Sequence, residues 1–164
     1  MSSAFVESVN VNPEGGVPKH PVEGAMIRSG GVEGDKQNDL RYHGGPDRAV
    51  SIYSSEIIRS LQSEGHPIGP GSSGENITIV GLDWGEIGPG KIMQIGRARI
   101  EITTPAAPCA TIRECFLNEE FSRISEKRNP GWSRWYARVL DEARVSPNDS
   151  CLLYTSDAAD DSLR

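Results

Sequence analysis

The stretch KIMQIGRARIEITT, residues 91–104, alternates apolar and polar side chains on both sides of Gly96 and Arg97. After this pair, Ile100 and Ile102 share one face, and the polar residues between and beside them share the other. Successive side chains of a β-strand point to opposite faces, and a glycine-containing pair is typical of a tight turn. The stretch therefore predicts two strands joined by a turn.

Three runs that precede this pair of strands predict further strands. AFVESVNV, residues 4–11, alternates and is followed by the turn-forming NPEGG, while AVSIY (49–53) and NITIV (76–80) are short and apolar. The 164 residues include 18 glycines and 11 prolines, which indicates many turns. We expect one domain that is mainly β with a few short helices.

Helical periodicity is limited to a few segments. Ser54 is a candidate N-cap for a helix that ends at Gly65. Residues 111–127 show a fair helical pattern with a break near Asn118. Residues 132–143 fit both a helix and a strand, and their spacing alone slightly favours a helix.

The overall charge and hydropathy limit the classes of partner. A net charge of −6 and a pI near 5.1 give no general attraction to nucleic acid or to anionic membranes, so an anionic ligand needs a local basic cluster. No apolar run approaches the roughly 20 residues of a membrane span, and the first residues lack a signal-peptide pattern. We expect a cytoplasmic protein that contacts neither nucleic acid nor membrane.

A glycine-rich bend within residues 31–50 is the first candidate site. Backbone N–H groups in such a bend, together with guanidinium groups, suit an anion such as a phosphate. A charged surface loop explains the same residue types equally well. The candidate residues are Asp35, Lys36, Arg41, His43, Gly44, Gly45, Asp47 and Arg48.

Two further patches carry polar or reactive side chains. Glu75 and Asn76 precede the strand at residues 76–80, where they fit a binding site or an ordinary turn equally well. Cys109 follows a proline at the start of a predicted helix, with Arg113 one turn further on. Such a thiolate is stabilised as a nucleophile or soft-metal ligand, whereas Cys115 has the spacing of an inert buried residue.

Four segments together resemble the MOSC domain, the C-terminal domain of molybdenum cofactor sulfurases, and especially its small stand-alone bacterial members. They are GVEGDKQNDLRYHGGPDRAVSIY, GENITIVGLDW, IGRARIEITTPAAPC and GWSRWYARVL, and the resemblance runs in order from Pro21 to Asp149. It implies a single β-barrel domain and a strand at residues 135–140. It also implies that Cys109 is the family's invariant thiol, as a molybdenum ligand or a sulfur carrier.

The resemblance also implies a cofactor and a reaction. The glycine bend would hold the pterin and phosphate of the molybdenum cofactor, with Arg48, Asn76 and Arg113 positioning it. Some stand-alone relatives reduce N-hydroxylated compounds, so we expect such a reductase, with electrons from a separate reductase because the sequence has no flavin, haem or iron–sulfur signature. Alternatives are a sulfur carrier with a persulfide on Cys109 and a non-catalytic cofactor-binding module. Pyridoxal phosphate is disfavoured because no lysine has a recognisable Schiff-base setting.

The end of the chain differs in composition, with a short apolar run followed by an Asp- and Ala-rich segment without periodicity. Residues 151–160, CLLYTSDAAD, match a translation of a common transposase sequencing adaptor. The sequence therefore predicts a MOSC domain over residues 1–150 that lacks its last strand, and a non-native tail over 151–164. We expect this tail to have no packed place and to leave an unfilled edge of the barrel.

Overall fold

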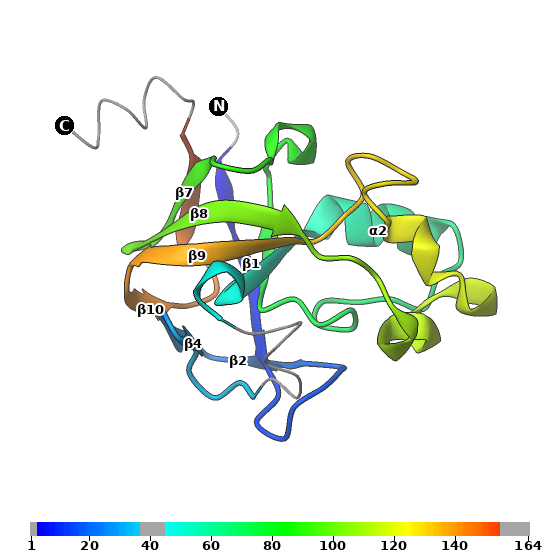
Figure 1. The fold of residues 1–164 in the computed structure, drawn as a ribbon, viewed down its shortest axis with the longest axis horizontal. Helices are drawn as coiled ribbons and strands as arrows, with labels where there is room; N and C mark the ends of the chain where they lie inside the picture. Colours follow the sequence, from blue (N-terminus) through cyan, green and yellow to red (C-terminus); the bar gives the residue numbers. More distant parts are fainter. Residues whose placement is uncertain (1–2, 37–44, 155–164) are drawn as a thin grey trace.

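Seven strands form one curved sheet, and its two edge strands pair with each other to close a barrel (Figure 1). The computed structural model describes residues 3–36 and 45–154. The closed order is β11-β7-β8-β9-β5-β6-β1, and the β1–β11 pairing completes it. The strands are β1 (Ala4–Val11), β5 (Val50–Ser54), β6 (Ile77–Val80), β7 (Ile92–Ile95), β8 (Ala98–Pro105), β9 (Trp135–Asp141) and β11 (Ser150–Leu153). The expected mainly β barrel is confirmed.

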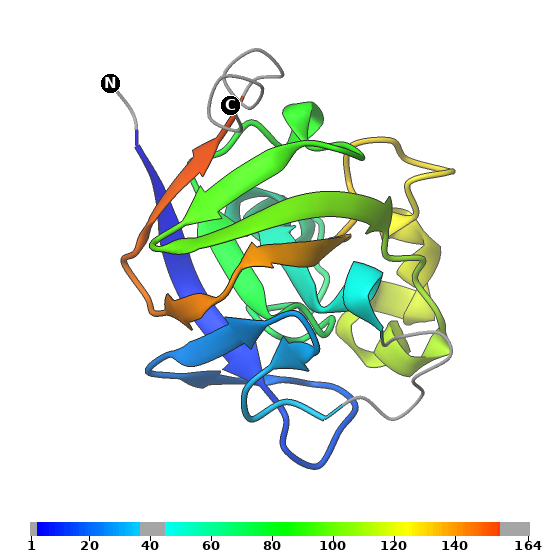
Figure 2. The same ribbon diagram turned by 60° about the vertical axis from the view of Figure 1, so that its left-hand side comes forward.

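Four short strands lie outside the closed ring. β2 (His20–Val22) extends the sheet beyond β1. β3 (Ala25–Arg28), β4 (Gly31–Val32) and β10 (Ala143–Val145) form a separate sheet in the order β10-β3-β4, which Figure 2 shows next to the barrel. Most interior positions of the barrel are filled by isoleucine, valine and alanine.

The strand pair predicted at residues 91–104 is present. β7 and β8 run antiparallel, with Ile95 opposite Ala98. Gly96 has a φ of 57°, a left-handed conformation that glycine adopts readily. Ile100 and Ile102 are buried, whereas Glu101 between them is partly exposed, as the alternation predicts.

One α-helix, α2 (Ser55–Ser63), connects the parallel strands β5 and β6. The Ser54 hydroxyl accepts a hydrogen bond from the Ile57 N–H at 3.1 Å, which confirms the predicted N-cap. Gly65 follows the helix with a φ of 101°. No helix in the described part of the chain is long and apolar enough to cross a membrane.

The helical pattern at residues 111–127 produces short 3-10 turns. They are η3 (Ala110–Cys115), η4 (Leu117–Glu119) and η5 (Phe121–Ile124), after the earlier turns η1 (Pro46–Arg48) and η2 (Trp84–Glu86). Asn118 has a φ of 54°, so the predicted break is present. A continuous helix is excluded because a left-handed residue interrupts the backbone hydrogen bonds.

Residues 135–141 form β9, so the preference of the spacing for a helix is wrong and the strand implied by the resemblance is correct. β9 pairs with β5 on one side and β8 on the other. Trp135 and Ala137 are buried and Arg138 is exposed, as expected of a strand with one interior face. Where the pattern of a segment fits both a helix and a strand, pairing with neighbouring strands decides its secondary structure.

The expectation of an unpacked segment after Ser150 is wrong for residues 151–153. These residues belong to β11, in which Cys151 is opposite Ile95 on one side and Ala4 on the other. Cys151 is buried, and burial raises the pKa of its thiol to about 12. The alternation of Cys151, exposed Leu152 and partly buried Leu153 matches the edge of the barrel, which explains why the segment pairs. Residues 155–164 lie outside the described residues.

Candidate functional site

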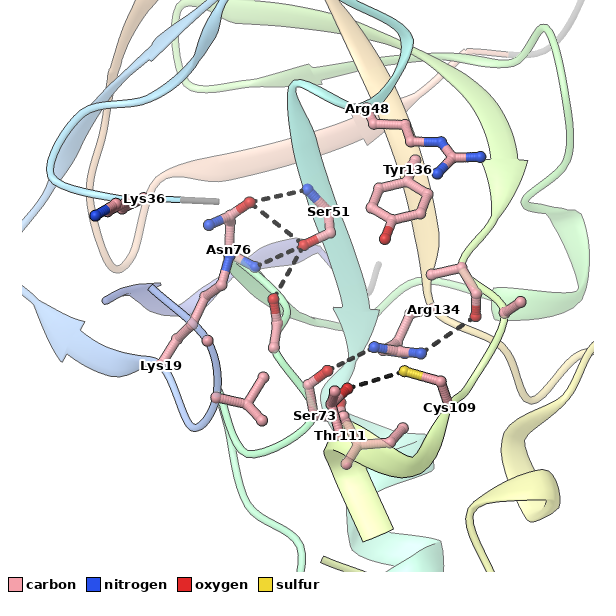
Figure 3. Close-up of a pocket in the computed structure, with 16 residues that line it drawn as sticks. Lys19, Lys36, Arg48, Ser51, Ser73, Asn76, Cys109, Thr111, Arg134 and Tyr136 are labelled. Atoms are coloured by element: carbon pink, nitrogen blue, oxygen red, sulfur yellow. Dashed lines mark hydrogen bonds between the residues drawn. The ribbon is translucent and has the colours of Figure 1, made fainter. Parts of the chain in front are cut away.

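A cavity of about 150 Å³ lies over the neighbouring strands β5 and β9 (Figure 3). Ser51 and Tyr136 are opposite each other in this strand pair, so their side chains share the face that looks into the cavity. Segments from several other parts of the chain complete the wall. The lining residues are Gly16, Val17, Lys19, Lys36, Arg48, Ser51, Ser73, Gly74, Asn76, Ala106, Ala107, Cys109, Thr111, Ile112, Arg134 and Tyr136.

The lining carries positive charge. Lys19, Lys36, Arg48 and Arg134 contribute to it, and no acidic side chain does so among the described residues. The chain as a whole has a net charge of −6, so this local excess is not a consequence of composition. Clustered cationic side chains in a concave site favour an anionic ligand.

Asp35 lies behind the lining and orients two of its side chains. Its carboxylate accepts hydrogen bonds from Lys19 Nζ at 2.5 Å, from Asn76 Nδ2 at 2.9 Å and from the Asn12 backbone N–H at 2.9 Å. The side chain is 4% exposed. Asp35 is not among the lining residues, and its oxygen atoms are hydrogen-bonded to the wall. Its expected contact with a cofactor stays a prediction.

Asn76 lines the cavity, as expected, and connects three segments. Its Oδ1 accepts hydrogen bonds from the backbone N–H and the hydroxyl of Ser51 at 3.1 and 3.3 Å. Its Nδ2 donates to the Asn10 carbonyl at 3.2 Å and to Asp35. The amide group thereby fixes β1, β5 and the start of β6 relative to one another.

Glu75 is fully buried and is not among the lining residues, so its expected contact with a cofactor stays a prediction that the geometry does not support. Its carboxyl group accepts hydrogen bonds from the Gly71 N–H at 2.9 Å, the Thr78 hydroxyl at 2.8 Å and the Ser73 hydroxyl at 3.2 Å. Burial raises the pKa of this carboxyl group. Glu75 shapes the loop that carries Ser73 and Gly74 to the wall.

The glycine-rich bend contributes two cations, Arg48 and Lys36, to the cavity. Gly45 has a φ of 92° and precedes η1, from which Arg48 reaches the lining and lies over the Tyr136 ring at 5.3 Å. Asp47 is turned away, and its carboxylate accepts a hydrogen bond from Arg138 Nη2 at 2.7 Å. Lys36 also lines the cavity. The predicted residues Arg41, His43 and Gly44 lie outside the described residues.

Cys109 lines the cavity just before η3, and its Sγ lies 2.9 Å from Thr111 Oγ1. It is partly exposed. Arg113 is not part of the lining: it donates to the Ala110 carbonyl at 3.0 Å and lies 3.6 Å from a carboxylate oxygen of Glu119. The guanidinium group expected near the thiol is instead that of Arg134.

Arg134 was not predicted from the sequence. It is 8% exposed, and it donates from Nη1 to the Ser73 carbonyl at 2.5 Å and from Nη2 to the Ala106 carbonyl at 3.2 Å. Its Nε is buried without a hydrogen-bond acceptor among the described residues. An arginine between Trp132 and Trp135, next to Ser133, is the one signal that could have identified it. Lys19 was missed as well, because no nearby motif distinguishes it.

Cys115 lies in the core, as predicted. It is 7% exposed, packs in the same cluster as Ile112 and Phe116, and donates to the Ile112 carbonyl at 3.1 Å. Burial raises the pKa of its thiol to about 11. The neutral thiol expected at this position is therefore supported by its surroundings.

The fold and the cavity together define a β-barrel domain with a basic cavity next to a thiol. The model of the MOSC domain family matches residues 39–151, and the chain belongs to that family. Among curated proteins it is 33% identical over 136 residues to the uncharacterized protein YflK of Bacillus subtilis, a match that covers 82% of this chain and 61% of YflK. It is 28% identical over 150 residues to the protein YiiM of Escherichia coli, with 87% and 66% covered. The chain thus spans less than two thirds of either relative.

Solved structures show the same fold. The crystal structure of YiiM from Geobacillus stearothermophilus superposes with a TM-score of 0.69 at 24% identity, over 93% of this chain and 75% of that one. YiiM from Escherichia coli gives a TM-score of 0.64 at 25% identity, over 92% and 70%. The YuaD protein of Bacillus subtilis gives 0.70 at 17% identity, over 94% and 100%.

Proposed function

We propose that this protein holds the molybdenum cofactor in the cavity and reduces N-hydroxylated compounds. The observation that carries the proposal is the position of Cys109 in a cavity lined by four basic side chains, in a member of the MOSC family. A thiolate is the ligand type that soft metals prefer, and guanidinium and ammonium groups bind phosphate. The residues present therefore fit a cofactor that combines a metal with an anionic pterin phosphate.

The described residues suggest a division of roles. Cys109 would supply the thiolate ligand, while Lys19, Lys36 and Arg48 would supply positive charge for the phosphate. No group of three or more histidine, cysteine or acidic residues in the described part of the chain could hold a metal ion. A metal at Cys109 would thus need other ligands, which the pterin provides. When bound, the cofactor supplies the oxygen-atom chemistry.

The remaining lining residues would orient the ligands and exclude water. Val17, Ala106 and Ile112 give the wall apolar surface, which strengthens electrostatic interactions inside the cavity. Reduction of an N-hydroxyl group to an amine and water consumes two electrons and two protons. We propose that a separate reductase protein delivers the electrons.

Elemental analysis of protein made in a cofactor-competent host tests the first part of this proposal. We expect molybdenum in stoichiometric amounts, and turnover of an N-hydroxylated compound when a competent electron donor is added. Protein without molybdenum from such a host would contradict cofactor binding. Bound molybdenum without turnover would contradict the reductase and would support a cofactor-binding module.

A sulfur carrier is the second candidate. It is favoured by the Cys109 thiol, which lines an open cavity and contacts the Thr111 hydroxyl, an arrangement that also suits a persulfide. Cyanide-labile sulfur on Cys109 in protein free of molybdenum would support this function over the reductase. Its absence, together with bound molybdenum, would exclude it.

A further inference from the structure

We infer that Arg134 makes the Cys109 end of the cavity selective for anionic groups. A ligand or substrate that reaches the sulfur is then favoured when it carries negative charge near the reacting atom. As a statement about substrates, this rests on the proposed function: N-hydroxylated compounds with a nearby carboxylate or ionised oxygen would be preferred over cationic ones. As a statement about the cavity, it can be tested on cofactor-free protein.

The first observation is how Arg134 is held. Its two terminal nitrogen atoms donate to the backbone carbonyl groups of Ser73 and Ala106, which belong to two different segments of the wall. The Ala106 N–H in turn donates to the Arg134 carbonyl at 2.9 Å. The guanidinium group is therefore fixed in place before any ligand binds, and its Nε remains without an acceptor among the described residues.

The second observation concerns charge compensation. None of the ion pairs among the described residues involves Arg134. The buried carboxyl group of Glu75 does feel the Arg134 charge, but burial is the larger effect and raises the pKa of that carboxyl group, which favours its neutral form. Its hydrogen bonds come from Gly71, Ser73 and Thr78 and not from Arg134. A buried charge that is hydrogen-bonded to neutral carbonyl groups keeps its field, and a low-dielectric wall screens it weakly.

The third observation is the position of the thiol. Ala106, which Arg134 holds, begins the short loop that leads to Cys109, and both side chains line the same cavity. Figure 3 shows Arg134, Ser73, Cys109 and Thr111 at one end of it and Lys19 and Lys36 at the other. Arg134 is thus the cation of the thiol end, whereas the lysines serve the opposite end.

Alkylation of Cys109 by two reagents measures this selectivity. Iodoacetate is anionic and iodoacetamide is neutral, and both attack the same sulfur, so the ratio of their rates cancels changes in thiol reactivity. We expect the rate with iodoacetate divided by the rate with iodoacetamide to be higher for Cys109 in the cofactor-free protein than for a free model thiol. Arg134→Met should lower it on the order of tenfold, because fields focused in a cleft change the rates of charged reagents by at least that factor. Arg134→Lys should retain most of it.

The matched control is Arg123→Met, which removes a guanidinium group that stacks on Trp132 and pairs with Glu64 outside the cavity. It should leave the ratio unchanged. A ratio that Arg134→Met changes by less than about twofold in folded protein would overturn the inference. If that variant does not fold, inorganic phosphate is used as a probe of the wild-type protein. Phosphate should slow iodoacetate labelling of Cys109 more than chloride at equal ionic strength, and equal slowing would also overturn the inference.

The two proposals can fail separately. Labelling uses protein without cofactor, so loss of selectivity in Arg134→Met supports the inference even if no molybdenum is ever bound. Bound molybdenum together with an unchanged ratio would leave the reductase proposal standing and remove Arg134 from this role.

Discussion

Cys109 and Cys115 belong to the same short stretch of chain and lie in opposite surroundings. Cys109 is partly exposed in a cavity rich in cations, next to the Thr111 hydroxyl. Cys115 is 7% exposed among Ile112 and Phe116, and burial raises the pKa of its thiol to about 11. Cys109 directly precedes η3 and opens to the cavity, whereas Cys115 ends η3 with its side chain in the core. Whether each cysteine faces the cavity or the core therefore determines how accessible its thiol is.

Alkylation by iodoacetamide at pH 8 should show the largest difference. With a pKa of about 11, about one Cys115 thiol in a thousand is ionised at that pH, and the core also blocks the reagent. We expect Cys109 to react at least on the order of 100-fold faster, as measured by mass spectrometry of the two peptides. Comparable rates in folded protein would break the comparison.

Replacement of Cys109 should abolish cofactor retention. Cys109→Ser keeps nearly the same shape but exchanges a soft ligand for a poor one. Loss of a residue that only supports a metal ligand typically lowers metal affinity roughly 10–100-fold. Because Cys109 would be a ligand itself, we expect the molybdenum content to fall by more than that, with the melting temperature little changed. Cys115→Ser provides the contrast, since it should retain the metal while losing stability. Equal retention by both variants would contradict the assignment of Cys109.

Truncation of Cys115 should act on stability alone. Cys115→Ala removes a buried sulfur atom from the core cluster, and we expect the free energy of unfolding to fall by about 1–2 kcal/mol. Cys109→Ala should change it by less than about 0.5 kcal/mol, as for a surface position. Denaturant unfolding of both variants measures the difference, and a greater loss for Cys109→Ala would reverse the comparison.

A pH-dependent effect is expected at Glu75, the buried acid behind the cavity. Because burial raises its pKa in the folded protein, the folded state binds this proton more tightly than the unfolded chain does. The free energy of unfolding therefore falls as the pH rises above the ordinary value of 4.5, by at most about 1.4 kcal/mol per pH unit. Glu75→Gln should remove this slope. Unfolding curves between about pH 4.5 and 7 test it, and parallel profiles for both proteins would contradict it.

The sequence predicted most of the barrel because its strands alternate clearly. Residues 91–104 and the capped helix after Ser54 formed as expected, since local patterning and tertiary packing agree there. Periodicity alone failed at residues 135–141, where pairing with β5 and β8 decides the state. The match to a sequencing adaptor also misled at residues 151–153, because these residues alternate and pair with β1 and β7 to close the barrel.

The candidate site was predictable only where a residue type has a distinctive local context. Cys109 after a proline and Arg48 after a glycine bend have such a context, and both line the cavity. Lys19 and Arg134 do not, because their importance comes from burial against distant segments. Asp35 was selected from the sequence, but its place behind Lys19 and Asn76 could not be predicted, since sequence does not distinguish a lining carboxylate from one that supports the lining.

Closure of the barrel by β1 and β11 has a consequence for how the chain folds. These two strands come from opposite ends of the described chain, and Ala4 pairs with Cys151. Contacts of such long sequence separation form slowly, because the loop they close is large. During synthesis, the first residues of β1 and the free edge of β7 therefore remain unpaired until β11 has emerged from the ribosome. This makes the nascent chain prone to association at those edges and gives chaperones a defined interval in which to act.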